Sequence, residues 1–268
     1  MIAGRVGGLW RHPVKGFTPE PVVEALLSEG GFFPFDRLYA LEAGPSGFDP
    51  GAPAFISKMK FAVLARFAAV ARMRTRYDAF TESLHLTDPD GREWDFDLTR
   101  DAGRQALARH VETVLARFDE DYDPARLPLK VLAVPDPDGL ESPFRFTDSA
   151  KGFVSLLNLN SLRDLGYRLG ADLDPLRLRC NIWMEGFAAF EDHAWVGKRL
   201  RVGGEGPELE VIKAIQRCVA THVNPGTAER DVDVCAGLWG HYGHLDCGIY
   251  ARIVKGGMVY PGDEIRLA

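Results

Sequence analysis

The sequence predicts a mainly β protein of the α+β class, in which a β-barrel packs on an amino-terminal domain of strands and helices. Short apolar stretches bounded by glycine, proline and aspartate recur along the 268 residues, whereas few stretches have helical spacing. Many short strands with few helices are typical of a barrel. An acidic, proline-containing segment at residues 119–128 indicates a linker. We therefore expect domains at residues 1–118 and 125–268, parts of which could interleave.

The first third should alternate strands with turns. The expected strands are residues 5–10, 22–27, 84–86 and 94–98. The last two flank Asp88-Pro89-Asp90-Gly91, a turn sequence that predicts a hairpin. Residues 44–51, rich in glycine and proline, should form a surface loop.

Three segments have the apolar spacing of a helix. Residues 61–71 are the first. Thr99 should cap a second helix that runs to residue 118 along one apolar stripe. The third is expected at residues 161–169, with Asn158 as an N-cap candidate. The rest of the second half should be extended, with strands at residues 129–134, 181–185, 198–202, 209–221, 248–254 and 264–267.

Charge and hydropathy exclude several classes of function. Lys and Arg total 32 against 38 Asp and Glu, which gives a net charge of −6. A nucleic-acid-binding protein would need a basic surface, so we expect no nucleic-acid partner. The apolar run at residues 61–71 is far short of the roughly 20 residues that span a bilayer. Residues 1–16 lack the apolar core of a secretory signal. We expect a cytoplasmic protein with no membrane partner.

The four cysteines, Cys180, Cys218, Cys235 and Cys247, have irregular spacing. This spacing differs from a disulfide framework and from a paired zinc site, so we expect reduced thiols. The sequence contains no iron–sulfur cysteine run, no G-x-G-x-x-G opening a helix and no Walker loop. Any redox electrons would come from another protein.

Three segments carry a combined motif: residues 10–16 (WRHPVKG), 179–182 (RCNI) and 216–225 (QRCVATHVNP). With Asp36-Arg37 and residues 248–252 (GIYAR), they resemble the MOSC family, named for the carboxy-terminal domain of molybdenum cofactor sulfurase. The resemblance covers nearly the whole chain. The front part resembles the β-barrel domain that precedes MOSC in amidoxime-reducing proteins, and residues 129–268 resemble MOSC itself.

The resemblance implies that Cys218 binds molybdenum, since in this family a cysteine that follows an arginine does so. The residue types agree with this role. A thiolate suits a soft or high-valent metal, and the neighbouring Arg217 would help to keep the sulfur deprotonated. Taken alone, a cysteine on an apolar strand is more often an inert core residue.

The family cofactor is a pterin dithiolene that carries a phosphate, so the resemblance implies cationic anchors. Arg179 and Asn181 match the R-x-P-N contact, with Cys180 in place of proline. On a strand, Arg179 and Asn181 would share one face. Lys15 matches the lysine of the P-V-K-S motif, and Arg37 matches the arginine of the D-R motif. Arg217 would also contact the pterin.

Three further candidates have alternative interpretations. Asn158 and Ser161 match a family segment in which the amino terminus of a helix meets the cofactor. They are equally well explained as plain helix caps. His222 stands where amidoxime reducers have threonine, and Asn224 where they have aspartate. His222 has the acidity of a general acid, or it is a hydrogen-bonding histidine behind the site.

Two polar clusters in the second half of the chain are weaker candidates for a functional site. His241, His244, Asp246 and Cys247 invite a zinc hypothesis, but their spacing matches none of the strong zinc patterns. A loop closing over the pocket is the preferred interpretation. The pair Asp192-His193 is interpreted as exposed on the surface.

These observations lead us to expect a molybdenum-molybdopterin enzyme that reduces N-hydroxylated or N-oxide compounds. Its partners would be a small-molecule substrate and a separate electron donor, such as a flavoprotein, a ferredoxin or a cytochrome b5-like protein. Pyridoxal phosphate is not expected. The alternative is a cofactor carrier or sulfur-transfer protein that uses Cys218. A third hypothesis is an empty MOSC fold with zinc at His241 and His244.

Overall fold

The computed structural model describes residues 3–126, 128–135, 144–150 and 153–268. Seven strands close into a barrel in the order β10-β9-β13-β12-β11-β15-β1, and β1 then pairs with β10. The barrel strands are β1 (Ala3–Arg11), β9 (Val154–Asn158), β10 (Ile182–Glu185), β11 (Arg199–Val202), β12 (Glu208–Gln216), β13 (Asp246–Lys255) and β15 (Glu264–Leu267). The predicted mainly β fold with a barrel is confirmed.

The inside of the barrel is apolar because side chains alternate along each strand. On β13, Ile249, Ala251 and Ile253 are buried in this alternating pattern. The neighbouring strands contribute similar residues, and together they form one continuous core. Most strand pairs are antiparallel, while β9 and β10 are parallel.

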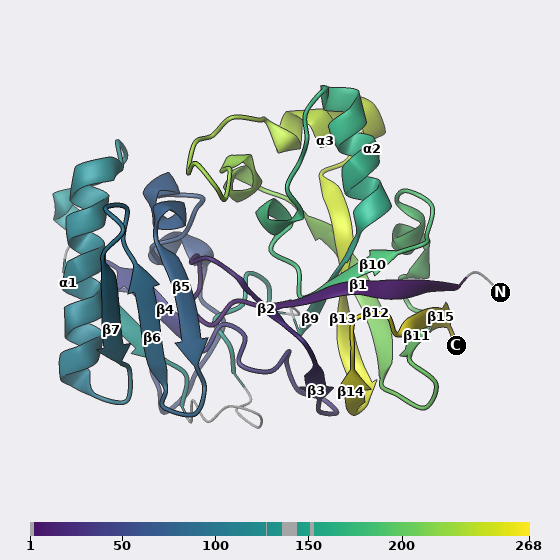
Figure 1. The fold of residues 1–268 in the computed structure, drawn as a ribbon, viewed down its shortest axis with the longest axis horizontal. Helices are drawn as coiled ribbons and strands as arrows, with labels where there is room; N and C mark the ends of the chain where they lie inside the picture. Colours follow the sequence, from purple (N-terminus) through teal and green to yellow (C-terminus); the bar gives the residue numbers. More distant parts are fainter. Residues whose placement is uncertain (1–2, 127, 136–143, 151–152) are drawn as a thin grey trace.

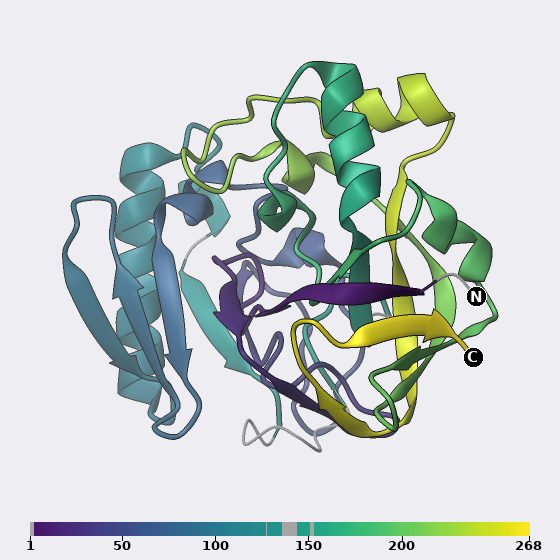
Figure 2. The same cartoon turned by 45° about the vertical axis from the view of Figure 1, so that its right-hand side comes forward.

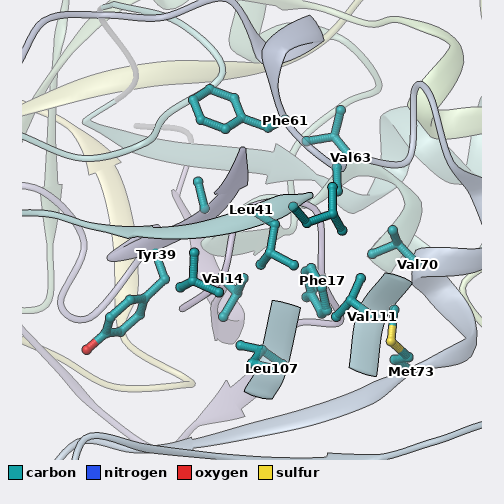
Figure 3. Packing of buried hydrophobic residues seen from close by; sticks show 14 of the residues in the cluster. Val14, Phe17, Tyr39, Leu41, Phe61, Val63, Val70, Met73, Leu107 and Val111 are labelled. Atoms are coloured by element: carbon teal, nitrogen blue, oxygen red, sulfur yellow. The ribbon is translucent and has the colours of Figure 1, made fainter. Parts of the chain in front are cut away.

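The other part of the molecule contains two small sheets and a helix, on the left in Figure 1. Strand β4 (Tyr39–Ala43) pairs with β8 (Leu129–Ala133), and β5 (Arg74–Asp78), β6 (Ser83–Thr87) and β7 (Glu93–Asp97) form a meander. Helix α1 (Asp101–Phe118) packs against β7 and β8. Figure 3 shows Leu107 and Val111 of this helix near Phe17 and Leu41 in the shared core.

The chain crosses between the two parts. Strand β1 belongs to the barrel, and β2 (Glu20–Val22) pairs with it. Strand β3 (Ala25–Leu27) pairs with β14 (Gly257–Val259). Strand β8 follows the expected linker and was therefore expected in the second domain. It pairs instead with β4 of the amino-terminal part. Residue 127 of that linker lies outside the described residues.

Several sequence predictions need correction. Residues 22–27 are not one strand, because Val22 pairs with Leu9 whereas Ala25 pairs with Val259. Residues 61–71 do not form an α-helix. They are apolar on all sides and are buried as turns, ending in a 3₁₀ helix (Ala68–Arg72). The Arg66 guanidinium donates to the carbonyls of residues 59 and 61, which satisfies this irregular backbone.

The helices follow the local signals only in part. Helix α2 (Leu159–Leu169) is confirmed, and Asn158 caps it by accepting from the Asn160 N–H. Helix α1 begins at Asp101 with Arg100 at the N-cap, so the prediction that Thr99 caps it is wrong. The Thr99 backbone N–H and hydroxyl both donate to Asp97.

The segment after β12 is the main difference in the second half. The strand predicted at residues 209–221 ends at Gln216, and a 3₁₀ helix (Val219–His222) follows. Helix α3 (Val234–Tyr242) lies where extended chain was expected; α2 and α3 are adjacent at the top of Figures 1 and 2. None of the helices in the described residues is both long and apolar enough to cross a bilayer.

Candidate functional site

A cavity of about 370 Å³ lies where the end of β12 faces the amino-terminal part. Its charged lining comprises Arg37, Lys58, Asp148, Arg177, Arg179, Lys213 and Arg217. Six of these side chains are basic and one is acidic. Cys180, Cys218 and Tyr250 also line it. A larger hollow of about 920 Å³ lies between β8 and the start of α1 and contains none of the predicted site residues.

Cys218 sits at the wall of this cavity, immediately after β12. It is half-buried, and Lys58 Nζ donates to its Sγ over 3.0 Å. Burial lowers the pKa of Lys58, but the hydrogen bond and the charge of Cys218 reverse this effect and raise it overall. Lys58 therefore stays an ammonium beside the sulfur. Sequence reasoning missed Lys58, because 160 residues separate it from Cys218 and no motif marked it.

The hydrogen bonds of the Arg217 guanidinium go to groups other than the Cys218 sulfur. The guanidinium donates to the carbonyls of Cys247 and Leu178 at 2.7 and 2.6 Å, and to Cys180 Sγ at 3.2 Å. Both residues line the cavity, but the direct contact with the Cys218 sulfur is made by Lys58 and not by Arg217.

Arg179 reaches the cavity from a turn and not from a strand. Its φ of 54° is left-handed, at the end of a 3₁₀ helix (Pro175–Leu178), and β10 begins only at Ile182. The expected strand geometry for Arg179 and Asn181 is therefore wrong. Arg179 Nη1 donates to the Phe17 carbonyl at 2.6 Å, whereas its buried Nη2 has no hydrogen-bond partner in the described structure.

Arg37 forms a closed charge network behind Arg179. Its guanidinium donates to Asp36 and to the Arg179 carbonyl, and His12 Nδ1 lies 3.1 Å from its Nη1. Asn181 Nδ2 also donates to Asp36, at 3.0 Å, and Asn181 does not line the cavity. Burial would raise the pKa of Asp36, but Arg37 and the His12 hydrogen bond lower it to about 2.

The charge of Arg179 is only partly balanced. Burial and the nearby Arg37 lower its pKa to about 10, against the opposing effect of Asp148 and Asp36. Arg37 itself has Asp36 as a direct counter-ion. Arg179 is thus a cation with a free donor facing the cavity, which suits an anionic ligand.

Lys15 lies outside the cavity lining. Its ammonium donates to the carbonyls of Phe146 and Thr147, both at 2.9 Å, and to Asp148 at 2.5 Å. Its three donors are therefore occupied. Burial lowers the pKa of Lys15, which Asp148 partly counteracts. The structure thus gives Lys15 the role of holding Asp148 at the cavity edge, where 37% of the Asp148 side chain is exposed.

Asn158, Ser161 and His222 do not line the cavity. Asn158 caps α2 and donates to the Ala188 carbonyl, and Ser161 Oγ accepts from the Phe190 N–H. His222 Nε2 lies 3.1 Å from Asp233, and burial lowers the pKa of His222. Ala220 and Thr221 line the cavity from this loop, and the Thr221 hydroxyl donates to the Cys218 carbonyl.

The late polar clusters are structural in the described chain. Within these residues no group of three or more His, Cys, Asp or Glu side chains is arranged to hold a metal ion. His244 Nδ1 accepts from the Asp246 N–H, and Cys247 is fully buried. The interpretation of Asp192 as exposed is wrong, because it is completely buried beside Asn158.

The residues of the cavity fit a phosphate-bearing cofactor with a thiolate-ligated metal. The fit rests on Cys218 with its ammonium partner and on the unpartnered Nη2 of Arg179. Arg177 also lines the cavity; its Nη2 is paired with Asp231, and its buried Nε is unpartnered among the described atoms. Buried polar atoms are normally hydrogen-bonded. Unpartnered guanidinium nitrogens in a lining with an excess of basic side chains suit an anionic ligand.

Comparison with known proteins supports a two-domain architecture. A model of the MOSC N-terminal β-barrel domain matches residues 3–126, and a model of the MOSC domain matches residues 143–266. No curated protein matches the sequence.

Among solved structures, the YuaD protein from Bacillus subtilis is similar over 98% of this chain and 94% of its own, with 13% identity and a TM-score of 0.45. YiiM from Geobacillus stearothermophilus is similar over 44% of this chain and 55% of its own, with 17% identity and a TM-score of 0.34. For YiiM from Escherichia coli the two coverages are again 44% and 55%, with 16% identity and a TM-score of 0.32.

Proposed function

Because the chain belongs to the MOSC family, with a MOSC N-terminal β-barrel domain ahead of a MOSC domain, we propose that it is a molybdenum-cofactor-dependent reductase of N-hydroxylated or N-oxide compounds. The observation that supports this most directly is the contact of Cys218 with Lys58 at the wall of a cationic cavity. A thiolate ligand, a neighbouring ammonium and free guanidinium donors together suit an anionic pterin cofactor.

Each lining residue has a separate task in this proposal. Cys218 ligates the metal, and Lys58 stabilises the ligand as a thiolate. Arg179 donates to the cofactor phosphate through its Nη2, which is unpartnered in the described structure, and Arg177, held by Asp231, adds positive charge to the lining. Arg217 braces the far wall through Cys180 and Cys247. Burial raises the pKa of Tyr250, so its phenol stays protonated as a donor in the cavity.

The bound cofactor supplies two-electron chemistry that removes oxygen from the substrate. For a hydroxylamine the balance is R–NHOH plus two electrons and two protons, giving R–NH2 and water. The sequence holds no flavin, nicotinamide or iron–sulfur fingerprint. The electrons therefore come from a separate donor, for which a flavoprotein, a ferredoxin or a cytochrome b5-like protein is suitable.

The test is the variant Cys218→Ser, made in cells that synthesise molybdopterin. We expect a folded protein with little molybdenum, measured by plasma mass spectrometry beside circular dichroism. Wild-type protein with reduced viologen should reduce an amidoxime, a hydroxylamine or an N-oxide, and the variant should not. Unchanged molybdenum in Cys218→Ser would refute the assigned ligand.

A second candidate function uses the same residues. The half-buried Cys218 with its ammonium neighbour also suits a carrier that hands over molybdopterin or a persulfide sulfur. A carrier needs no turnover. Molybdenum-loaded protein that reduces none of the test compounds with viologen would favour the carrier over the reductase.

A further inference from the structure

Two cavities meet at Cys218. Beyond the 370 Å³ cavity, a second cavity of about 30 Å³ lies toward the amino-terminal part. The residues that line both cavities are Lys58, Asp148, Arg179, Cys218 and Ala220. Cys218 therefore stands in a shared wall and can be approached from two sides.

The two cavities differ in chemistry. The residues that line only the small cavity are Gly16, Val63, Leu64 and Ala65, none of which is charged. The large cavity adds Arg177, Lys213 and Arg217 to the shared residues. A phosphate-bearing cofactor would therefore occupy the large cavity, whose volume falls in the range of about 300–1,000 Å³ usual for small-molecule sites. With the large cavity filled, the small cavity remains for a substrate; it is lined by the shared Lys58, Asp148 and Arg179 and by the uncharged residues 63–65.

The small cavity ends at a seam between the two parts of the molecule. Residues 63–65 come from the amino-terminal part, and Ala220 comes from the loop after Cys218. Arg230 spans this seam. Its Nη2 donates to the Leu64 carbonyl at 2.9 Å and its Nη1 to the Val219 carbonyl at 3.1 Å. Arg230 is exposed, so this latch lies on the outer side.

We propose that this seam is the substrate port, that Ala65 and Leu64 set its width, and that Arg230 holds it narrow. The inference rests on the proposed reductase function and deepens it by naming the residues that limit the size of the substrate. The small cavity has about the volume of one water molecule in the liquid, roughly 30 Å³. The port therefore selects substrates whose reacting end is narrow, such as an N–OH or N–O group that projects from a larger body.

Filling the port is the first arm of the test. Ala65→Phe should leave molybdenum and pterin contents normal, and viologen should still reduce the metal, followed by the Mo(V) electron paramagnetic resonance signal. The kcat/KM for hydroxylamine compounds should fall at least tenfold. Ala125→Phe, at an exposed alanine in the 3₁₀ helix Pro124–Arg126, is the matched control. Normal kcat/KM in a metal-loaded Ala65→Phe protein would overturn the port.

The second arm of the test removes the Arg230 latch. The protein then does not have to accommodate a larger side chain. Arg230→Ala should raise kcat/KM for a bulky N-hydroxy compound at least fivefold relative to hydroxylamine, with unchanged metal content, whereas Arg230→Lys should show a smaller shift. Equal selectivity in all three proteins would refute the latch. If metal-loaded wild-type protein reduces none of the compounds, the proposed function fails and the port with it. If the wild-type protein is active and the variants have the same kcat/KM values and selectivity, the proposed function stands and only the port is refuted.

Discussion

Removing the Lys58 ammonium is the most informative single perturbation of the site. In Lys58→Met the side chain keeps its length but loses the donor that lies 3.0 Å from Cys218 Sγ. A hydrogen bond to a charged group contributes about 1.5–3 kcal/mol. Because Lys58 is only half-buried, solvent screening favours the lower end of this range. About 1.4 kcal/mol corresponds to a factor of ten.

The assay uses the reactivity of the Cys218 sulfur in cofactor-free protein. We expect iodoacetamide to alkylate Cys218 roughly tenfold more slowly in Lys58→Met, because an adjacent cation stabilises the reactive thiolate. Alkylated Cys218 is quantified by peptide mass spectrometry, which separates it from the other three thiols. Lys58→Arg should retain most of the rate. Lys60→Met, on the same exposed turn, is the matched control. Equal rates in Lys58→Met and wild type would refute the role of Lys58.

Two further predictions concern the charges around Arg179. Arg179→Ala should lower pterin content by an order of magnitude or more, whereas Lys15→Met should act mainly on thermal stability, because the donors of Lys15 are satisfied within the protein; fluorescence of the released pterin and calorimetry distinguish them. Burial and then the charge of Arg37 lower the pKa of His12 from 6.5 to about 3. The unfolded chain therefore binds the additional proton first, and stability should fall by roughly 1.4 kcal/mol per pH unit as the pH drops from 6.5 toward 3. Urea unfolding of wild type and His12→Gln measures this slope; an equal slope in both would exclude His12 as its cause.

Local signals in the sequence predicted the elements that depend on local interactions. The turn at Asp88-Pro89-Asp90-Gly91 placed the hairpin of β6 and β7, and Asn158 marked the start of α2. The prediction of a helix at residues 61–71 failed, because the apolar spacing only reflects that most of these side chains are buried. Periodicity cannot distinguish a buried helix from buried turns.

A sequence motif predicted several residues of the site. The direction and the partners of each side chain depend on the fold and could not be predicted. The motif named Cys218 and Arg179, and both line the cavity. It could not show that Arg217 donates to Cys180 or that Lys58 contacts the Cys218 sulfur. Lys15 contacts Asp148 although 133 residues separate them, so the spacing of residues in the sequence could not predict this contact.

The closure of the barrel by β1 has a consequence for how the molecule folds. Ala3 pairs with Arg266, so the first strand meets the last, and both ends of the chain lie together in Figure 1. Such distant contacts fold slowly, because the closure entropy of a long loop comes before the contacts form. Until β15 has been synthesised, β1 can pair with β10 but the sheet stays open at two edges, which are sites for aggregation. The carbonyl of Trp10, in β1, accepts a hydrogen bond from Asn181, and the carbonyl of Phe17 accepts one from Arg179. The cationic cavity is therefore completed only when the two halves of the chain have met.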